Sequence, residues 1–84
     1  MIKWNKRVSM EQVIQLISQI GGIDAVAPDA GIYDAGFSSV RVLELILSLE
    51  QEFGISIPDE DFIAAGTPRK IAELVQRLRE RQVA

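Results

Sequence analysis

The spacing of apolar residues constrains the fold of this chain more than any other feature of its sequence. In three segments, apolar side chains recur at steps of three and four residues, the repeat that places them on one face of an α-helix. The positions are Val13, Leu16, Ile17 and Ile20 in the first segment, Val40, Leu43, Ile46, Leu47, Leu49 and Phe53 in the second, and Ile71, Leu74, Val75 and Leu78 in the third. The pattern predicts three amphipathic helices packed around one core.

Residues that begin and end helices lie at the borders of these segments. Ser9 is followed three residues later by Gln12, which is the spacing of a capping box. Two glycines at 21–22 stop the first helix, and Gly54 ends the second as a left-handed cap. Ser38 is a preferred N-cap for the second helix, and Thr67 with the proline after it begins the last helix.

The stretch from Gly21 to Phe37 is a 17-residue connection without sustained periodicity. Proline and glycine interrupt any regular element in it. Its scattered apolar residues, which we expect to anchor the loop on the core, are Ile23, Val26, Ile32 and Tyr33. Connections this long are uncommon in small domains and are often functional. We therefore expect an ordered loop that is a candidate functional segment.

Two short elements complete the predicted fold. Residues 55–58 alternate like a strand but have no partner strand, so we expect an extended crossing segment. Residues 58–62 are expected to form one helical turn with Pro58 at its first position. The sum is an all-α fold, a small three- to four-helix bundle with a long first loop. With 84 residues there is room for one domain, which we place at 1–84.

Composition excludes several functions. The net charge is −3, so a nucleic-acid partner is not expected, because phosphate binding needs a basic face. The chain has no cysteine and no histidine, which removes thiolate chemistry, disulfides and the commonest general base and metal ligand. We therefore expect no enzymatic activity and no metal site. No targeting segment or apolar run of about 18 residues is visible. A cytoplasmic monomer without a membrane partner is expected.

Charge is unevenly distributed along the chain. Residues 34–61 contain seven acids and one base, a local charge of −6, whereas residues 67–84 carry a net charge of +3. The acidic half is either an ordinary solvated surface or a docking face for basic partners.

Two hydroxyl groups, those of Ser38 and Ser39, follow the long loop and open the second helix. The start of a helix presents unpaired N–H groups and a partial positive charge, which would stabilise an attached phosphate. A serine in this position is more often an N-cap than a modification site. From these residues alone, both interpretations remain open.

Two linked motifs resemble those of acyl and peptidyl carrier proteins. Residues 34–45 read DAGFSSVRVLEL, similar to the family's attachment motif D-x-G-x-D-S-L-x-x-x-E-L. Residues 49–60 read LEQEFGISIPDE, similar to the family's L-E-x-x-F-x-I-x-I-P-x-E segment. The close match covers about residues 34–61, and the predicted order of helices resembles the family over the rest.

The resemblance implies a covalent cofactor, 4'-phosphopantetheine, which a phosphopantetheinyl transferase takes from coenzyme A and attaches to one serine. Aligning Gly36, Glu44 and Leu45 with the motif places that serine at Ser39. Ser38 falls where the family often has aspartate, and its expected role is the N-cap. The missing cysteine fits this interpretation, because the thiol comes with the cofactor.

The resemblance also implies partners: an acyl- or aminoacyl-loading ligase or transferase, and downstream synthases of fatty-acid, polyketide or nonribosomal-peptide type. The candidate docking residues are Val40, Arg41, Glu44, Leu47 and Glu50. For Leu47, a core position is the alternative. Ser38 and Arg41 make the start of the helix more positive than in many fatty-acid carriers. The difference indicates either partners other than those of a housekeeping carrier or neutral drift on an exposed face.

Two other functions are alternatives to a carrier. A carrier-like helical interaction module would dock on partners without a prosthetic arm. A serine hydrolase would need a base and an enclosed pocket, and the chain has no histidine, no G-x-S-x-G elbow and too small a core.

Overall fold

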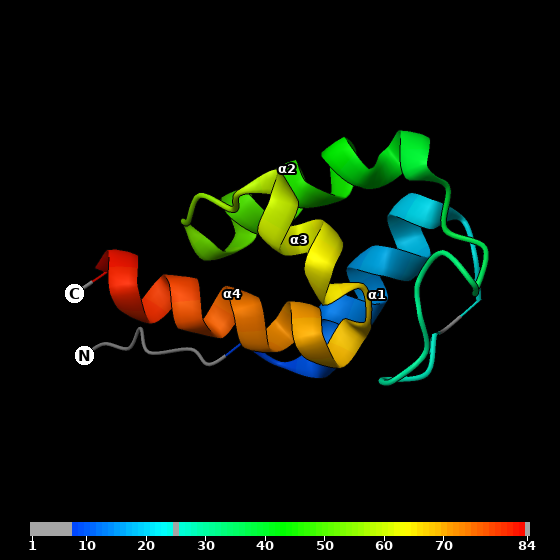
Figure 1. The fold of residues 1–84 in the computed structure, drawn as a ribbon, viewed down its shortest axis with the longest axis horizontal. Helices are drawn as coiled ribbons and strands as arrows, with labels where there is room; N and C mark the ends of the chain where they lie inside the picture. Colours follow the sequence, from blue (N-terminus) through cyan, green and yellow to red (C-terminus); the bar gives the residue numbers. More distant parts are fainter. Residues whose placement is uncertain (1–7, 25, 84) are drawn as a thin grey trace.

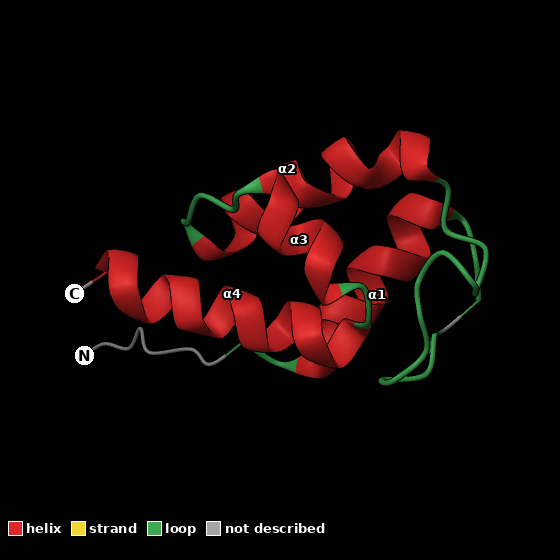
Figure 2. Ribbon diagram, viewed as in Figure 1, coloured by secondary structure: helices red, strands yellow, loops and turns green. Residues whose placement is uncertain are grey.

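The regular elements of this computed structural model are all helical within the residues it describes, 8–24 and 26–83. In chain order they are α1 (Met10–Gly21), the 3₁₀-helix η1 (Ser39–Arg41), α2 (Val42–Phe53), α3 (Asp59–Ala65) and α4 (Pro68–Val83). Figure 2 shows the long loop between α1 and η1 and the short connections between the later helices. The predicted all-α bundle with a long first loop is confirmed.

Helix α1 begins and ends where its cap residues predict. The Ser9 hydroxyl accepts a hydrogen bond from the Gln12 backbone N–H, and the Gln12 side chain accepts from the Ser9 backbone N–H. At the other end Gly22 has φ +64°, the left-handed conformation that glycine adopts without a Cβ clash. Local sequence therefore determines both ends of this helix.

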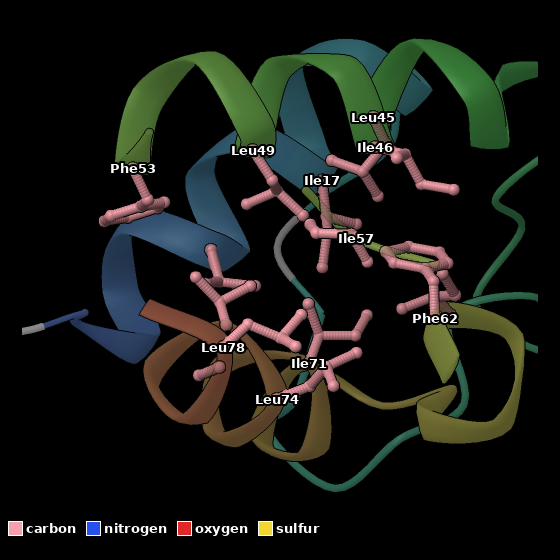
Figure 3. Close-up of a cluster of buried hydrophobic side chains, with 14 of the residues drawn as sticks. Ile17, Leu45, Ile46, Leu49, Phe53, Ile57, Phe62, Ile71, Leu74 and Leu78 are labelled. Carbon is pink, nitrogen blue, oxygen red and sulfur yellow. The ribbon is translucent and has the colours of Figure 1, made fainter. Parts of the chain in front are cut away.

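One apolar core joins all four α-helices. In Figure 1, α2 runs along one side of the molecule and α4 along the opposite side, and α1 packs against both. Figure 3 shows side chains from every α-helix and from the 55–58 segment converging on the space between them. The members buried almost completely are Val13, Ile17, Ile32, Leu45, Leu49, Phe62, Ile71 and Val75. Burial of this apolar surface is the main force that holds the bundle together.

Helix α3 is longer than the single turn expected at residues 58–62. It spans Asp59–Ala65, and Pro58 is its N-cap rather than its first residue. Ala64 and Ala65 are good helix formers, so the helix continues until Gly66, whose φ of +72° ends it. The acids Asp59–Asp61 form its first turn, where negative side chains interact favourably with the positive end of the helix dipole.

The segment 55–58 is extended, as predicted, and side chains satisfy its backbone in place of a partner strand. Glu50 Oε2 accepts a hydrogen bond from the Ile57 N–H at 2.7 Å. The Gln82 side chain accepts from the Ser56 N–H at 2.9 Å and donates to the Ser56 carbonyl at 3.1 Å. Because backbone groups that lose water need partners, these two side chains allow the segment to cross the core.

Replacing Glu50 with alanine is expected to lower the free energy of unfolding by about 1–2 kcal/mol, because the N–H of buried Ile57 loses its charged acceptor. Urea denaturation measures the change. The matched control is Glu52→Ala on the exposed side of the same helix, with an expected effect within about 0.5 kcal/mol. Equal losses in the two variants would contradict the structural role of Glu50.

The first loop is fixed to the junction between α3 and α4 by backbone hydrogen bonds. The Ile32 N–H donates to the Gly66 carbonyl, and the Arg69 N–H donates to the Pro28 carbonyl, both at 2.9 Å. Val26 and Ile32 are buried, which confirms two of the expected anchors. Ile23 is half-buried, but Tyr33 is 40% exposed and is not an anchor, because it lies in the turn at 32–36, where residues 33–36 are all exposed.

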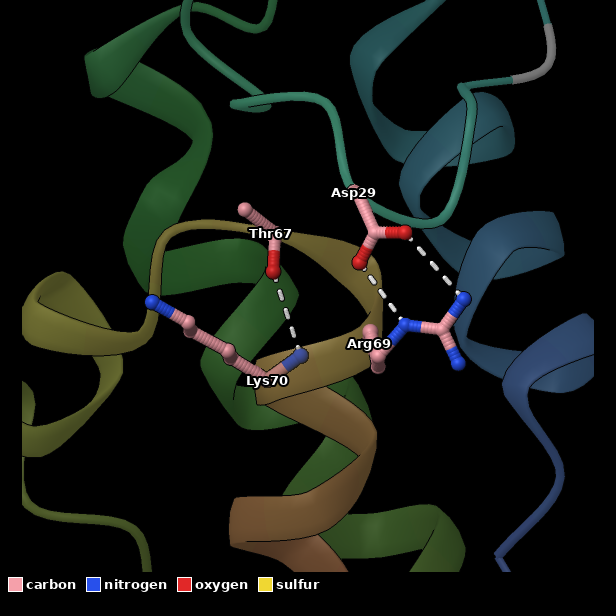
Figure 4. A network of polar contacts seen from close by, with 4 residues as sticks. All are labelled: Asp29, Thr67, Arg69 and Lys70. Carbon is pink, nitrogen blue, oxygen red and sulfur yellow. Dashed lines mark hydrogen bonds and ion pairs between the residues drawn. The ribbon is translucent and has the colours of Figure 1, made fainter.

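An ion pair joins the same loop to the start of α4 (Figure 4). Arg69 donates to both carboxylate oxygens of Asp29, at 2.7 and 3.2 Å. This hydrogen bonding lowers the pKa of the Asp29 carboxyl from its ordinary value. Because the pKa is lowered in the folded state, the ion pair contributes to folding stability at neutral pH. This contribution to stability is lost as the pH falls through the pKa of Asp29 in the folded protein. Thr67 Oγ1 accepts from the Lys70 N–H at 3.2 Å and caps α4, as predicted.

Candidate functional site

The serine pair lies where the first loop enters η1, and its two hydroxyl groups have different surroundings. Ser38 is the N-cap, and its Oγ accepts a hydrogen bond from the Val40 N–H at 3.2 Å. Ser39 is the first residue of η1 and is exposed. Within the described residues, its Oγ takes part in no hydrogen bond, whereas its carbonyl accepts one from the Val42 N–H. Ser39 therefore presents a free hydroxyl group to solvent.

The backbone that leads into the pair is well anchored. Gly36 has φ +107°, which turns the chain sharply before it enters the helix. The next residue, Phe37, is only 3% exposed, and its N–H donates to the Ile32 carbonyl at 2.9 Å. A buried aromatic ring thus lies directly before two exposed serines and fixes where they emerge.

Four of the five predicted docking residues are exposed near or along the same helix. Val40 is 86% exposed and Leu47 is 48% exposed, so Leu47 is not a core residue. Arg41 and Glu44 form an exposed ion pair, with Nη1 and Oε1 3.4 Å apart. Glu50 differs, because it is half-buried and bonded to the Ile57 N–H. A docking role for these residues remains a prediction.

Two further large apolar residues, which were not among the predicted docking residues, are also exposed. Leu43 is 60% exposed on α2, and Ile63 is 58% exposed on α3. We call Val40, Leu43 and Leu47, which follow one another along η1 and α2, the apolar face. The signal for Leu43 was present, since residues 40, 43 and 47 form a helical stripe of their own. That stripe is displaced around the helix from the buried residues Leu45, Ile46, Leu49 and Phe53.

Large exposed apolar side chains are a minority on a small protein surface, and a group of them marks an interaction site. Here the group begins one residue after the free hydroxyl of Ser39. The arrangement offers a nucleophilic oxygen for modification beside a surface on which a partner can dock.

A family model described as a phosphopantetheine attachment site matches residues 11–75. The chain belongs to this family of carrier domains. The match runs from α1 through the serine pair into α4, so it includes every element that positions the site. The resemblance to acyl and peptidyl carrier proteins is confirmed, and so is the cofactor, covalently attached 4'-phosphopantetheine. Carrier domains of this family are not themselves catalytic.

A curated relative is the non-reducing polyketide synthase Preu3 of Preussia isomera, 30% identical over 70 residues. These residues are 81% of this chain but only 3% of the synthase. The chain therefore corresponds to one small part of that much larger protein.

Solved structures share the carrier fold. A docking-domain complex of the Pax NRPS, PaxA T1-CDD with PaxB NDD, matches with a TM-score of 0.81 at 17% identity, over 99% of this chain and 85% of that one. The hexanoyl acyl carrier protein of the actinorhodin polyketide synthase from Streptomyces coelicolor matches with a TM-score of 0.75 at 21% identity, over 93% of this chain and 98% of that one. At these identities the similarity shows the fold alone.

The residues present fit the carrier cofactor. A phosphodiester requires a serine oxygen that a transferase can reach, and Ser39 Oγ is exposed and free of hydrogen bonds in the described structure. Among residues 8–24 and 26–83, no acidic cluster is arranged to hold a metal ion. Across the same residues, no helix combines the length and the apolar character needed to span a bilayer.

Proposed function

We propose that this chain is an acyl or aminoacyl carrier with its 4'-phosphopantetheine arm on Ser39, and that it carries thioester-bound intermediates between enzymes. The observation that supports this most directly is the contrast within the serine pair. Ser38 uses its hydroxyl as a helix cap, whereas the Ser39 hydroxyl is exposed and unbonded. The alignment of the attachment motif selects the same serine.

The chain's own residues supply the attachment oxygen and a rigid base for the arm. Ser39 Oγ attacks the β-phosphorus of coenzyme A, the phosphoanhydride bond breaks, adenosine 3',5'-bisphosphate leaves, and the transferase accepts the serine proton. The arm supplies the terminal thiol on which the intermediate is held as a thioester. A mobile arm on a small domain raises the local concentration of that intermediate at each partner's active site.

The proposed partners are the loading enzyme and synthases of a polyketide- or peptide-type assembly. A curated relative that is a polyketide synthase supports the class of pathway. The apolar face supports the mode of docking, because a partner that covers Val40, Leu43 and Leu47 removes apolar surface from water close to the arm. A carrier must bind each enzyme weakly, because it has to leave one enzyme for the next.

Modification of the wild-type chain tests the proposed function. The full chain is incubated with coenzyme A and a broad-specificity phosphopantetheinyl transferase, and its intact mass is measured. We expect a gain equal to one phosphopantetheine. An unchanged mass, beside a known carrier that is modified in the same assay, would favour an interaction module that docks without an arm.

The transferase KM for this chain is expected to depend little on salt. The two charged residues nearest to Ser39 on η1 and α2, Arg41 and Glu44, are opposite in sign and pair with each other. Raising the ionic strength from about 0.1 M to about 1 M shortens the Debye length from about 10 Å to about 3 Å, yet KM should change by less than about threefold.

The companion variant is Leu43→Ser, which should raise KM about tenfold because docking no longer buries a leucine. Steady-state kinetics measure both effects, and kcat at saturating chain concentration controls for salt acting on the transferase itself. A KM that rises steeply with salt but does not respond to Leu43→Ser would contradict apolar docking.

A further inference from the structure

The last residue of α1 contacts the aromatic ring that precedes the serine pair. An ideal Cβ on Gly21 would lie 2.7 Å from Cδ2 and 3.0 Å from Cε2 of Phe37. Carbon atoms in contact are normally about 3.5–4.0 Å apart. The Phe37 ring therefore occupies space that is open only because residue 21 has no side chain.

The backbone of Gly21 does not itself require glycine. Its φ is not positive, unlike that of Gly22, Gly36, Gly54 and Gly66. As a helical residue, Gly21 is less favourable than alanine in intrinsic propensity. Helix formation therefore favours a side chain at this position, and the contact with Phe37 is the feature of the structure that opposes one.

We propose that Gly21 is a positioning residue for the attachment serine, acting through Phe37. Phe37 is 3% exposed and belongs to the packed core, where neighbouring side chains restrict its movement. Phe37 directly precedes the N-cap Ser38, which is followed by Ser39. Ile23 lies beside both the Gly21 and Gly36 positions, 3.6 Å from an ideal Cβ on each. The end of α1 thus sets where the loop enters η1, and with it the place of Ser39 Oγ.

This inference rests on Ser39 being the attachment site. In addition, α1, a helix distant in sequence, positions part of the segment that carries Ser39. A small displacement of a reacting atom is costly, because a misplacement of about 1 Å can lower a rate by about a hundredfold. A methyl group on residue 21 is therefore expected to slow arm transfer even in a chain that is still folded.

The test compares Gly21→Ala with Gly22→Ala in the full chain, using coenzyme A and a phosphopantetheinyl transferase below the unfolding temperature of each variant. Gly21→Ala should lower kcat/KM for arm transfer by about tenfold or more. Gly22→Ala is the matched control, since it strains a backbone at φ +64° but its Cβ would meet no atom within 4 Å. It should lower the melting temperature and leave kcat/KM within about twofold of wild type.

A compensating substitution tests the contact itself. Phe37→Val removes the δ and ε carbons that a methyl on residue 21 would meet. In the Gly21→Ala background, Phe37→Val should restore kcat/KM to within about threefold of the kcat/KM of Phe37→Val alone.

If Gly21→Ala does not fold, restored folding in the double variant supports the contact, and an unfolded double variant overturns it. A folded Gly21→Ala chain that is modified at the wild-type rate also overturns the proposal.

Amide chemical shifts separate this inference from the proposed function. In Gly21→Ala, the backbone amides of residues 38–41 should shift, whereas in Gly22→Ala they should not. These shifts require no modification, so they decide the positioning claim even if the wild-type chain accepts no arm. Unshifted amides in a folded Gly21→Ala chain would contradict it.

Discussion

Ser39→Ala is expected to abolish attachment of the phosphopantetheine arm completely, because the substitution removes the oxygen that we propose forms the phosphodiester. The exposed Ser39 side chain makes no hydrogen bond in the described structure, so its loss should leave the fold and the melting temperature close to wild type. Intact mass after incubation with coenzyme A and transferase measures the effect, and circular dichroism confirms that the variant is folded.

Ser38→Ala is the matched control for this prediction. It removes the hydroxyl that caps η1 and should cost about 1 kcal/mol of stability. Arm attachment should persist, since Ser39 Oγ is retained. The opposite pattern, with modification lost in Ser38→Ala and kept in Ser39→Ala, would show that the chain is aligned with the attachment motif one residue out of register.

Phe62→Ala is expected to give the largest loss of stability, about 3–5 kcal/mol, because it leaves a cavity where a whole ring is buried. Phe62 is 1% exposed, and Figure 3 shows it extending from α3 into the buried cluster. A domain of this size is stable by roughly 4–12 kcal/mol in total. The variant should therefore unfold at much lower urea concentration or lack a folded state at room temperature.

Its neighbour Ile63 provides the contrast. Ile63 is on the same short helix but is 58% exposed. Ile63→Ala should therefore change stability by less than about 1 kcal/mol. Urea denaturation of both variants measures the difference. Similar losses of stability at the two positions would mean that Ile63 also packs in the core and would contradict the contrast in burial.

The features that the sequence predicts well are those that residues close in the chain determine. The Ser9 capping box, the left-handed glycines at 22 and 54, the N-cap Ser38 and the Thr67 cap all act over a few residues. The attachment motif is also a local pattern. Its turn glycine and its helix start follow from nearby residues, whereas the choice of Ser39 over Ser38 follows from the resemblance to the carrier-family motif.

The features that the sequence does not show depend on contacts between distant segments. Apolar spacing places Leu43 and Leu49 on one amphipathic helix, but the packing of α1 and α4 decides that Leu49 is buried and Leu43 is exposed. Glu50 has the appearance of a surface acid, and the crossing segment, whose Ile57 N–H donates a hydrogen bond to it, comes close only in the folded chain. The contact between Gly21 and Phe37 spans the whole first loop.

Mapping the arm on the wild-type chain tests the central claim most directly. Trypsin should release residues 8–41 as one peptide, because no lysine or arginine lies between Arg7 and Arg41. Fragmentation of this peptide from the modified protein is predicted to place the added mass on the C-terminal fragment 39–41, and so on Ser39, since its only hydroxyl is that of this serine. A fragment 39–41 of unmodified mass beside a modified fragment 38–41 would assign the arm to Ser38 and contradict the account.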